Sequence, residues 1–271
     1  MTRFIANARM YAVAPEAEAA WQDLLAHVAA EAGVALDYEP YPAPQPLEEL
    51  WRRPDLGAVQ MCGYPIALKL ADVVPLAAPI PALPWAEGRA VYRSDFIVRA
   101  DSSYQSLEET FSGTFGWTVP HSHSGFNAPR HHLLGYRTPA RPVLFRRCAG
   151  NLVTARRILD SVRDGSIDIG PLDAYWHALI ALHRPELTTG VRVLASTALA
   201  PMPAFVASAA LPAESAARLR DAFVQAATHA WFPALAGPLC LSGFTPVAQA
   251  TFIPTLAWHE AALAAGYDVP A

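Results

Sequence analysis

The chain has 271 residues, with 20 Lys and Arg against 24 Asp and Glu, so its formal net charge is -4. This balance excludes a surface that binds nucleic acid through bulk charge, because such surfaces need an excess of basic residues. Hydrophobic residues make up 53% of the chain, yet a charged residue, a proline or a histidine interrupts every apolar run before the roughly 18 residues that cross a bilayer. We therefore expect a globular protein with no nucleic-acid partner and no membrane insertion.

The N-terminal residues and the cysteines bear on the cellular compartment. Arg9 interrupts the stretch in which a secretory signal peptide needs an unbroken apolar core, so no signal peptide is visible. Two alternatives stay open: a leader that was removed before this sequence begins, or a leaderless protein of the cytoplasm, which the initial methionine favours. Cys62, Cys148 and Cys240 are odd in number, far apart and form no CxxC pair. They predict neither a disulfide framework nor a zinc ribbon.

The first third of the chain predicts alternating strands and helices. Residues 4–13 predict a strand, and residues 15–33 predict a helix because apolar residues recur at helical spacing between Pro15 and Gly33. A strand at 34–38, a helix at 47–51 and a buried strand at 57–62 follow, and Gly63-Tyr64-Pro65 predicts a strand-to-helix turn. Residues 73–84 contain four prolines, so only a short strand is expected there.

The middle of the chain predicts a lobe of its own. Residues 90–100 alternate in polarity and predict a strand long enough to pass from one lobe to another. The elements expected after it are strands at 114–119, 143–145, 167–170 and 191–195, and helices at 107–111, 128–134, 152–162 and 173–182. The rest of the chain predicts a strand near Phe205 and helices at 213–230 and 252–265.

This order of elements predicts an α/β protein of two lobes. Lobe I is expected to comprise residues 1–90 and 195–271, and lobe II residues 91–194. Each lobe is expected to be a mostly parallel sheet flanked by helices, with a ligand cleft between the lobes.

The segment His121-Ser-His-Ser-Gly-Phe-Asn127, here called the serine loop, carries the residues best suited to bind a ligand. It joins a predicted strand to a predicted helix, where backbone N–H groups favour an anion. Ser122 and Ser124 add hydroxyls, Asn127 adds an amide, and Gly125 lets the backbone approach a ligand closely. An ordinary serine helix cap is the alternative, but ligands bind at the carboxyl ends of strands in open α/β sheets.

Three further residues are candidates for the same cleft. Tyr11 and Tyr64 follow buried strands at turns, and Asp173 begins a helix directly after a strand. Core packing is the alternative for each tyrosine, and a helix N-cap is the alternative for Asp173. We predict that the carboxylate of Asp173 accepts a hydrogen bond from a ligand amine or hydroxyl.

Metal, cofactor and nucleophile chemistry find little support. His121, His123, His131 and His132 suit a metal by residue type, but neighbours on a helix point about 100° apart and no Cys or Glu stands at ligand spacing. Ser124 is not part of a GxSxG turn, and the chain has neither GxGxxG nor GxxxxGK[ST]. We expect no metal, no cofactor and no catalytic residue.

With these residues in this order, the chain resembles the phosphate/phosphite/phosphonate-type substrate-binding proteins of ABC transporters, a branch of the type II periplasmic-binding fold. The similarity is carried by Ala8-Arg-Met-Tyr, Met61-Cys-Gly-Tyr-Pro-Ile, residues 92–102, Ser122-His-Ser-Gly-Phe-Asn, residues 164–176 and Leu241-Ser-Gly-Phe. The resemblance implies that Ser122, Ser124 and Gly125 hold the anionic group of a ligand, and that Tyr64 and Asp173 belong to the site.

The resemblance implies a solute-binding protein without catalytic activity that closes around a small anionic or zwitterionic molecule and works with an ABC transporter permease. The two crossings between lobes, residues 89–93 and 193–196, are the expected hinges. Two alternatives stay open. One is an enzyme on the same fold, as in thiamin-pyrimidine synthesis, motivated by His121 and His123; the other is a ligand-sensing regulatory module.

Overall fold

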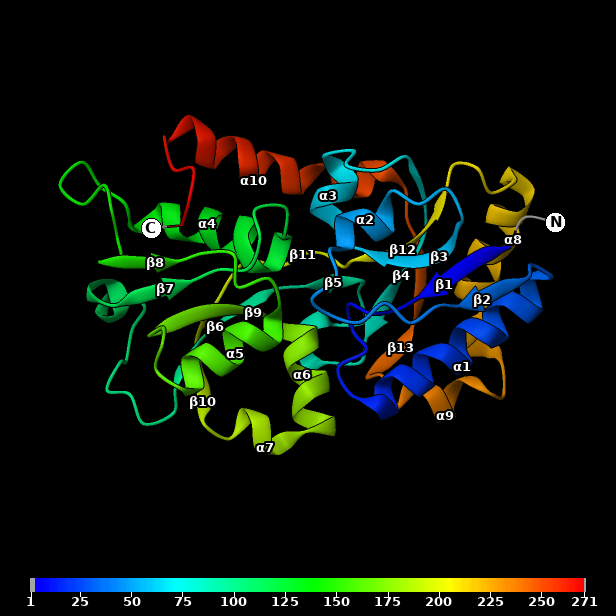
Figure 1. The fold of residues 1–271 in the computed structure, drawn as a ribbon, viewed down its shortest axis with the longest axis horizontal. Helices are drawn as coiled ribbons and strands as arrows, with labels where there is room; N and C mark the ends of the chain where they lie inside the picture. Colours follow the sequence, from blue (N-terminus) through cyan, green and yellow to red (C-terminus); the bar gives the residue numbers. More distant parts are fainter. Residues whose placement is uncertain (1–2, 271) are drawn as a thin grey trace. The chain divides into compact units, whose positions relative to one another are not determined.

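The protein consists of two compact units, described over residues 3–270 in a computed structural model (Figure 1). Unit 1 comprises the chain up to Tyr92 together with residues 201–253, and unit 2 comprises residues 93–200 and the chain from Pro254 onward. Each unit has a main β-sheet with helices packed on it, so the α/β character predicted from the sequence is present in both.

The C-terminal residues lie in a different unit from the one expected. Residues 195–271 were predicted to return to the first lobe, whereas the chain from Pro254 onward packs on unit 2. There the carbonyl of Thr255 accepts a hydrogen bond from Asn127, and the ring of Trp258 stacks on that of His131. These contacts join segments more than a hundred residues apart, which no local pattern in the sequence could indicate.

The sheet of unit 1 has six strands in the order β13-β4-β12-β3-β1-β2. Its central strand β3 (Leu56–Met61) runs parallel to β1 (Phe4–Asn7), which in turn is parallel to β2 (Leu36–Tyr38). The strands β12 (Ala204–Ser208), β4 (Val73–Pro81) and β13 (Leu241–Pro246) are joined by antiparallel pairing. The sheet is therefore mixed, not mostly parallel as expected.

Aromatic packing holds the helices of unit 1 on this sheet. Helix α1 (Pro15–Ala32) starts at a proline and ends at Gly33, which has a φ of 60° and so favours glycine. Its Trp21 packs on Phe205 of β12 with ring centroids 5.6 Å apart, and Phe205 stacks on Phe223 of α8 at 4.8 Å. The helices of this unit are α1, α2 (Leu47–Trp51), α3 (Gly63–Ala67), α8 (Ala213–Gln225) and α9 (Phe232–Ala236), with short helices η1 (Pro84–Ala86), η5 (Ala226–Thr228) and η6 (Gln249–Phe252).

Strand β4 is longer than its prolines suggested, since the expectation of only a short strand at 73–84 was wrong. The N–H of Ala82 donates to the carbonyl of Cys240 on the β13 side. Because N–H groups alternate in direction along a strand, the positions of Pro79 and Pro81 face away from β13. Strand β12 pairs with residues 73–77 only, so these two prolines interrupt no ladder.

The sheet of unit 2 has five strands in the order β10-β6-β9-β7-β8. Strand β7 (Thr114–Gly116) is parallel to β8 (Arg147–Ala149) and β9 (Ile169–Asp173), whereas β6 (Ser94–Arg99) is antiparallel to β9 and to β10 (Val191–Ser196). This sheet too is mixed. Two short strands, β5 (Val91–Tyr92) and β11 (Ala200–Pro201), pair separately.

The helices of unit 2 follow the predicted order with shifted ends. They are η2 (Glu108–Ser112), η3 (His123–Asn127), α4 (Ala128–Leu133), η4 (Leu134–Tyr136), α5 (Ala155–Arg163), α6 (Ala174–His183) and α7 (Pro185–Thr188), while α10 (Ile253–Ala264) begins at the last residue of unit 1 and continues in unit 2. The strand predicted at 143–145 is wrong: Leu144 and Phe145 are core residues, and the strand lies at β8 instead. No helix among the described residues is both long and apolar enough to span a membrane.

Candidate functional site

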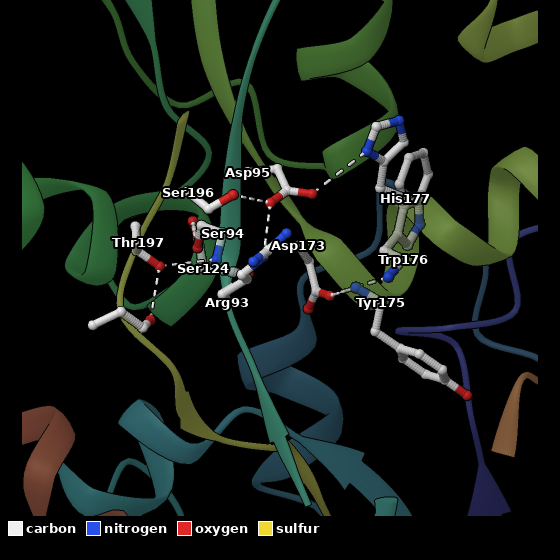
Figure 2. Close-up of polar contacts among 11 residues, drawn as sticks. Arg93, Ser94, Asp95, Ser124, Asp173, Tyr175, Trp176, His177, Ser196 and Thr197 are labelled. Carbon is white, nitrogen blue, oxygen red and sulfur yellow. Dashed lines mark hydrogen bonds and ion pairs between the residues drawn. The ribbon is translucent and has the colours of Figure 1, made fainter. Parts of the chain in front are cut away.

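One edge of the unit 2 sheet collects polar residues from four strands (Figure 2). The parallel strands β7 and β9 direct their carboxyl ends to this edge, which brings the serine loop and Asp173 to it. Because β6 is antiparallel to β9, its first residue Ser94 lies there too, paired with Asp173. Strand β10 contributes Ser196, which pairs with Asp95. Chain segments far apart in sequence thus form one polar site.

The hydroxyl of Ser122 is used by the protein itself. It accepts a hydrogen bond of 3.0 Å from the N–H of Gly125 and caps η3, a single π-helical turn. The carbonyl of Ser122 accepts from the N–H of Asn127, also at 3.0 Å. Ser122 is therefore a helix cap, the alternative considered for this residue, and its hydroxyl stabilises the conformation of the loop.

Ser124 occupies a different position in the loop. Its carbonyl accepts a hydrogen bond of 2.9 Å from the hydroxyl of Ser94, and the residue is only 9% exposed. Within residues 3–270 its own hydroxyl has no hydrogen-bond partner. The residue is largely buried, but this hydroxyl is not among its fully enclosed polar atoms, so Ser124 can form a hydrogen bond with a molecule from outside the chain.

Gly125 is required for a reason that the sequence did not reveal. A Cβ at this position would lie 2.0 Å from Oγ1 of Thr118, and the carbonyl of Gly125 accepts from the N–H of Thr118 at 3.1 Å. The close approach that demands glycine is therefore to the protein's own Thr118.

Asn127 has a structural task where we had predicted a ligand contact. Its Nδ2 donates to the carbonyl of Thr255 at 2.8 Å and lies 3.2 Å from Nδ1 of His123, while its Oδ1 accepts from Arg130 at 3.3 Å. Both ends of the amide are engaged, and the residue is fully buried. Asn127 thus fixes the serine loop to α4 and to the C-terminal segment.

Asp173 caps helix α6 at the site edge. Its Oδ1 accepts from the N–H groups of Tyr175 at 2.9 Å and Trp176 at 3.0 Å, and the residue is 7% exposed (Figure 2). The capping alternative applies here as well, but a carboxylate can accept several bonds at once. Its capping bonds fix Asp173 at the edge that also carries the serine loop.

Sequence reasoning missed a cluster around Asp95 at the same edge. The hydroxyl of Ser196 donates to Oδ1 of Asp95 at 2.6 Å, and Nε of Arg93 donates to the same oxygen at 3.2 Å. Nδ1 of His177 lies 3.8 Å from Oδ2 (Figure 2). Alternation in a strand puts Arg93 and Asp95 on one face, so that pair could have been found, whereas Ser196 and His177 come from β10 and α6.

Ser94 and Thr197 form a second link at this edge. The N–H of Ser94 donates to Oγ1 of Thr197 at 3.0 Å, and the N–H of Thr197 donates to the carbonyl of Ser94 at 2.9 Å. Since the hydroxyl of Ser94 also holds the carbonyl of Ser124, the beginning of β6 and the end of β10 are connected directly to the serine loop.

Of the two histidines in the serine loop, His123 is held in its neutral form at neutral pH by burial. Burial lowers the pKa of His123 to about 3, and the charge of nearby His131 acts in the same direction. The ring of His123 lies 5.2 Å from that of Trp258. Over the described part of the chain, no group of His, Cys, Asp and Glu side chains has the arrangement to hold a metal ion.

The two predicted tyrosines lie in unit 1 and are buried there. Tyr11 follows β1, and its carbonyl accepts a hydrogen bond of 3.3 Å from Nε1 of Trp21. Tyr64 lies in α3, immediately after β3. Because β1 and β3 are parallel neighbours, both tyrosines follow the carboxyl edge of the unit 1 sheet, which therefore carries its own set of candidate residues.

Arg9 lies in the same turn as Tyr11, although it was not among the predicted ligand-binding residues. Its guanidinium donates to the carbonyl of Gln45 and lies over the ring of Tyr41 at 5.4 Å. Its backbone N–H donates to Oδ1 of Asn7 at 2.9 Å. Burial lowers the pKa of Arg9 from its ordinary value.

Comparison with known proteins places this architecture in a family. The model of the family described as "ABC transporter, phosphonate, periplasmic substrate-binding protein" matches residues 11–252. No curated protein matches the chain. The family description is of a binding component and not of an enzyme, in agreement with the expectation from the sequence.

Solved structures share the two-lobed α/β fold. A binding-protein component of an ABC phosphonate transporter from Pseudomonas aeruginosa has a TM-score of 0.79 at 19% identity, over 97% of this chain and 88% of that one. PhnD1 from Prochlorococcus marinus, in complex with methylphosphonate, has a TM-score of 0.77 at 13% identity, over 96% and 98% of the two chains. A protein of Xanthomonas citri bound to ATP has a TM-score of 0.66 at 20% identity, over 98% of each chain. At these identities the likeness establishes the fold.

Proposed function

Since the chain belongs to the family of periplasmic substrate-binding proteins of phosphonate ABC transporters, we propose that it binds a small phosphonate at the serine loop of unit 2. The observation that carries this assignment is Ser124: its hydroxyl has no hydrogen-bond partner within residues 3–270, is not fully enclosed, and lies in the loop that follows a parallel strand. A phosphonate oxygen would accept a hydrogen bond from this hydroxyl, and hydrogen bonds to charged groups are stronger than those between neutral groups.

The charge distribution at the edge supports a ligand that is not purely anionic. Arg93 supplies one cation, while Asp95 and Asp173 supply two buried carboxylates. We assign the phosphonate group to the side of the serine loop and a hydroxyl or amine substituent to Asp173. The hydroxyl and backbone N–H dipoles of the loop would then stabilise the negative charge of the phosphonate without a full positive charge beside it.

Tyr11 and Tyr64 complete the proposal from unit 1. Their position after the carboxyl edge of that sheet, where open α/β sheets bind ligands, supports a role of both tyrosines in ligand binding. Closure at the crossings would then present the liganded form to the membrane components of an ABC transporter.

Isothermal titration calorimetry tests the proposed ligand. Methylphosphonate, 2-aminoethylphosphonate and inorganic phosphate are titrated into the wild type, with acetate as a carboxylate control. We expect at least one phosphonate to bind, and we expect Ser124→Ala to weaken it roughly ten- to a hundredfold, the range for a bond to a charged group. Failure of every phosphonate to bind would overturn the proposal.

A matched variant separates this site from general effects of losing a serine. Ser208, in unit 1, is buried and its hydroxyl accepts a bond of 3.1 Å from the N–H of Ala210. Ser208→Ala should bind as the wild type does. Equal affinities of Ser124→Ala and Ser208→Ala would leave the loop as a plain helix cap, and mass spectrometry showing a new product after incubation would favour the enzyme alternative.

A further inference from the structure

The side chain of Gln60 is the most unusual polar group in unit 1. The residue is 2% exposed, and neither Nε2 nor Oε1 has a hydrogen-bond partner within residues 3–270. The backbone carbonyl of Gln60 is hydrogen-bonded, because it accepts from Nε1 of Trp51 at 2.9 Å. Only the carboxamide is left unpaired, although buried polar groups in proteins are almost always hydrogen-bonded.

The strand pairing shows on which face of the sheet this carboxamide lies. Gln60 of β3 is directly opposite Phe205 of the antiparallel strand β12, and residues in this relation share a face of the sheet. Phe205 packs on Trp21 of α1, whose Nε1 donates to the carbonyl of Tyr11. Gln60 therefore belongs to the side of the sheet on which α1 and the Tyr11 turn pack.

Gln60 is also close to the edge that carries the candidate residues of unit 1. It is the second-last residue of β3, and β3 leads through Cys62 into α3 with Tyr64. Leucine in its place would fill the same interior without an unpaired amide, so glutamine is unfavourable for folding unless something bonds it. Exceptions of this kind to folding rules are expected at functional sites.

We infer that Gln60 is a further ligand-contacting residue that contributes to specificity, with its carboxamide completing its hydrogen bonds only when a ligand is bound. This inference rests on the proposed function and concerns the candidate residues of unit 1, Tyr11 and Tyr64. A carboxamide is neutral and offers both a donor and an acceptor. It matches a ligand group that also has both, such as the P–OH and P–O⁻ oxygens of a phosphonate monoanion.

Two measurements on Gln60→Leu separate a ligand contact from a structural role. Thermal unfolding without ligand should show a raised melting temperature, because an unpaired amide has been replaced by an apolar side chain of similar size. Calorimetry with methylphosphonate should show binding at least tenfold weaker than in the wild type. The opposite directions of the two effects are the signature of a residue retained for binding.

Trp231→Phe is the control for removing a buried unpaired donor. Nε1 of Trp231 is likewise buried without a partner among the residues that the structure describes, and its ring stacks on His27 at 4.6 Å. His27 lies on the turns of α1 beyond Trp21, away from Tyr11. Trp231→Phe should leave the affinity for methylphosphonate unchanged.

Unchanged affinity of Gln60→Leu would overturn the inference and leave an internal water as the partner of the amide. If Gln60→Leu does not fold, Gln60→Met is measured in its place, because methionine keeps an unbranched side chain. Failure of both variants to fold would also overturn the inference, since the amide would then be needed for folding. If the wild type binds a phosphonate and the Gln60 variant binds it equally well, the role of Gln60 is contradicted while the proposed function stands. Absence of wild-type binding to methylphosphonate, 2-aminoethylphosphonate and phosphate contradicts the proposed function, and this inference with it.

Discussion

Gly125 shows at the scale of one residue how a functional and a structural reason can be confused. A Cβ at this position would meet Oγ1, Cγ2 and Cβ of Thr118 within 3.0 Å. Gly125→Ala should therefore lower the free energy of unfolding by about 1–3 kcal/mol even without ligand, as overpacking does. Chemical denaturation of the ligand-free protein measures this.

Gly135→Ala is the matched substitution. A Cβ there would meet nothing within 4 Å, so the stability of this variant should stay close to that of the wild type. If Gly125→Ala were as stable as the wild type and yet failed to bind methylphosphonate, close approach of the ligand would be the reason for glycine after all.

Asp173 allows its two roles to be tested separately. Asparagine caps helices as well as aspartate does, whereas alanine in place of either costs about 1 kcal/mol. Asp173→Asn should thus keep the stability of the wild type, and Asp173→Ala should lose about 1 kcal/mol on denaturation. If the carboxylate faces a ligand amine, Asp173→Asn weakens 2-aminoethylphosphonate in calorimetry while methylphosphonate binds as before. Equal losses for both ligands would exclude a contact with the amine.

Residue chemistry allowed the location of part of the candidate site to be predicted, while contact of these residues with a ligand stays a prediction. Ser124 and Asp173 stand out by type and by position after strands, and the structure places both at one edge of unit 2. The sequence could not show that the amide of Asn127 donates to the carbonyl of Thr255, nor that Ser196 donates to Asp95, because these pairs are separated by 128 and 101 positions. Such contacts depend on tertiary pairing and leave no local pattern.

At the scale of elements, helices and strands were predicted correctly where the interactions that determine them lie within the segment itself. The helices predicted at 15–33 and 47–51 agree with α1 and α2, because their spacing, proline and glycine signals lie within the segment. Strand β13 was not predicted, and β4 was judged too proline-rich, because each is stabilised by its neighbours in the sheet. Antiparallel pairing in both sheets was missed for the same reason.

The contact between α4 and α10 makes unit 2 sensitive to acid. Burial lowers the pKa values of His131 and His132 on α4 and of His259 on α10, besides that of His123. The charges that act on His259 are those of Arg130, which lowers its pKa further, and Glu260, which raises it.

The sign of the pH dependence follows from these directions. The unfolded chain protonates histidine near pH 6.5, whereas folded His123 does so only near pH 3. Between these values the unfolded state binds more protons, so stability is complete above about pH 6.5 and falls as the pH decreases. Each such histidine contributes a slope of up to about 1.4 kcal/mol per pH unit.

His123→Phe tests this dependence, since phenylalanine can keep the stacking on Trp258 without a titrating group. Urea denaturation between pH 6.5 and pH 5 should give a shallower loss of stability in this variant than in the wild type. An unaltered slope in His123→Phe would show that this residue is not the acid-sensitive group.

At the scale of the whole molecule, the chain passes from unit 1 to unit 2 after Tyr92 and returns after Ala200. On the unit 2 side of these crossings, Ser94 pairs with Thr197 and Asp95 with Ser196 (Figure 2). The hydroxyl of Ser94 extends this set of bonds to the serine loop. Residues next to these two crossings and the proposed binding loop are therefore joined by hydrogen bonds within unit 2. We expect that weakening these bonds near the crossings changes binding at the loop.

If ligand closes the lobes, small-angle scattering should show that saturating methylphosphonate reduces the radius of gyration, as hinge closure does. Thr197→Val removes the acceptor of the buried Ser94 N–H, and leaving such a group unpaired costs about 1–3 kcal/mol. We expect this variant to bind methylphosphonate more weakly than the wild type, and to reach the same compact state at saturation. Thr110→Val is its control, because Thr110 is a buried threonine of unit 2 whose hydroxyl, within residues 3–270, bonds only the nearby carbonyl of Leu107. A radius of gyration unaltered by calorimetrically verified saturation would mean that binding occurs without closure, and equal affinities of the two threonine variants would mean that the crossings are not coupled to the serine loop.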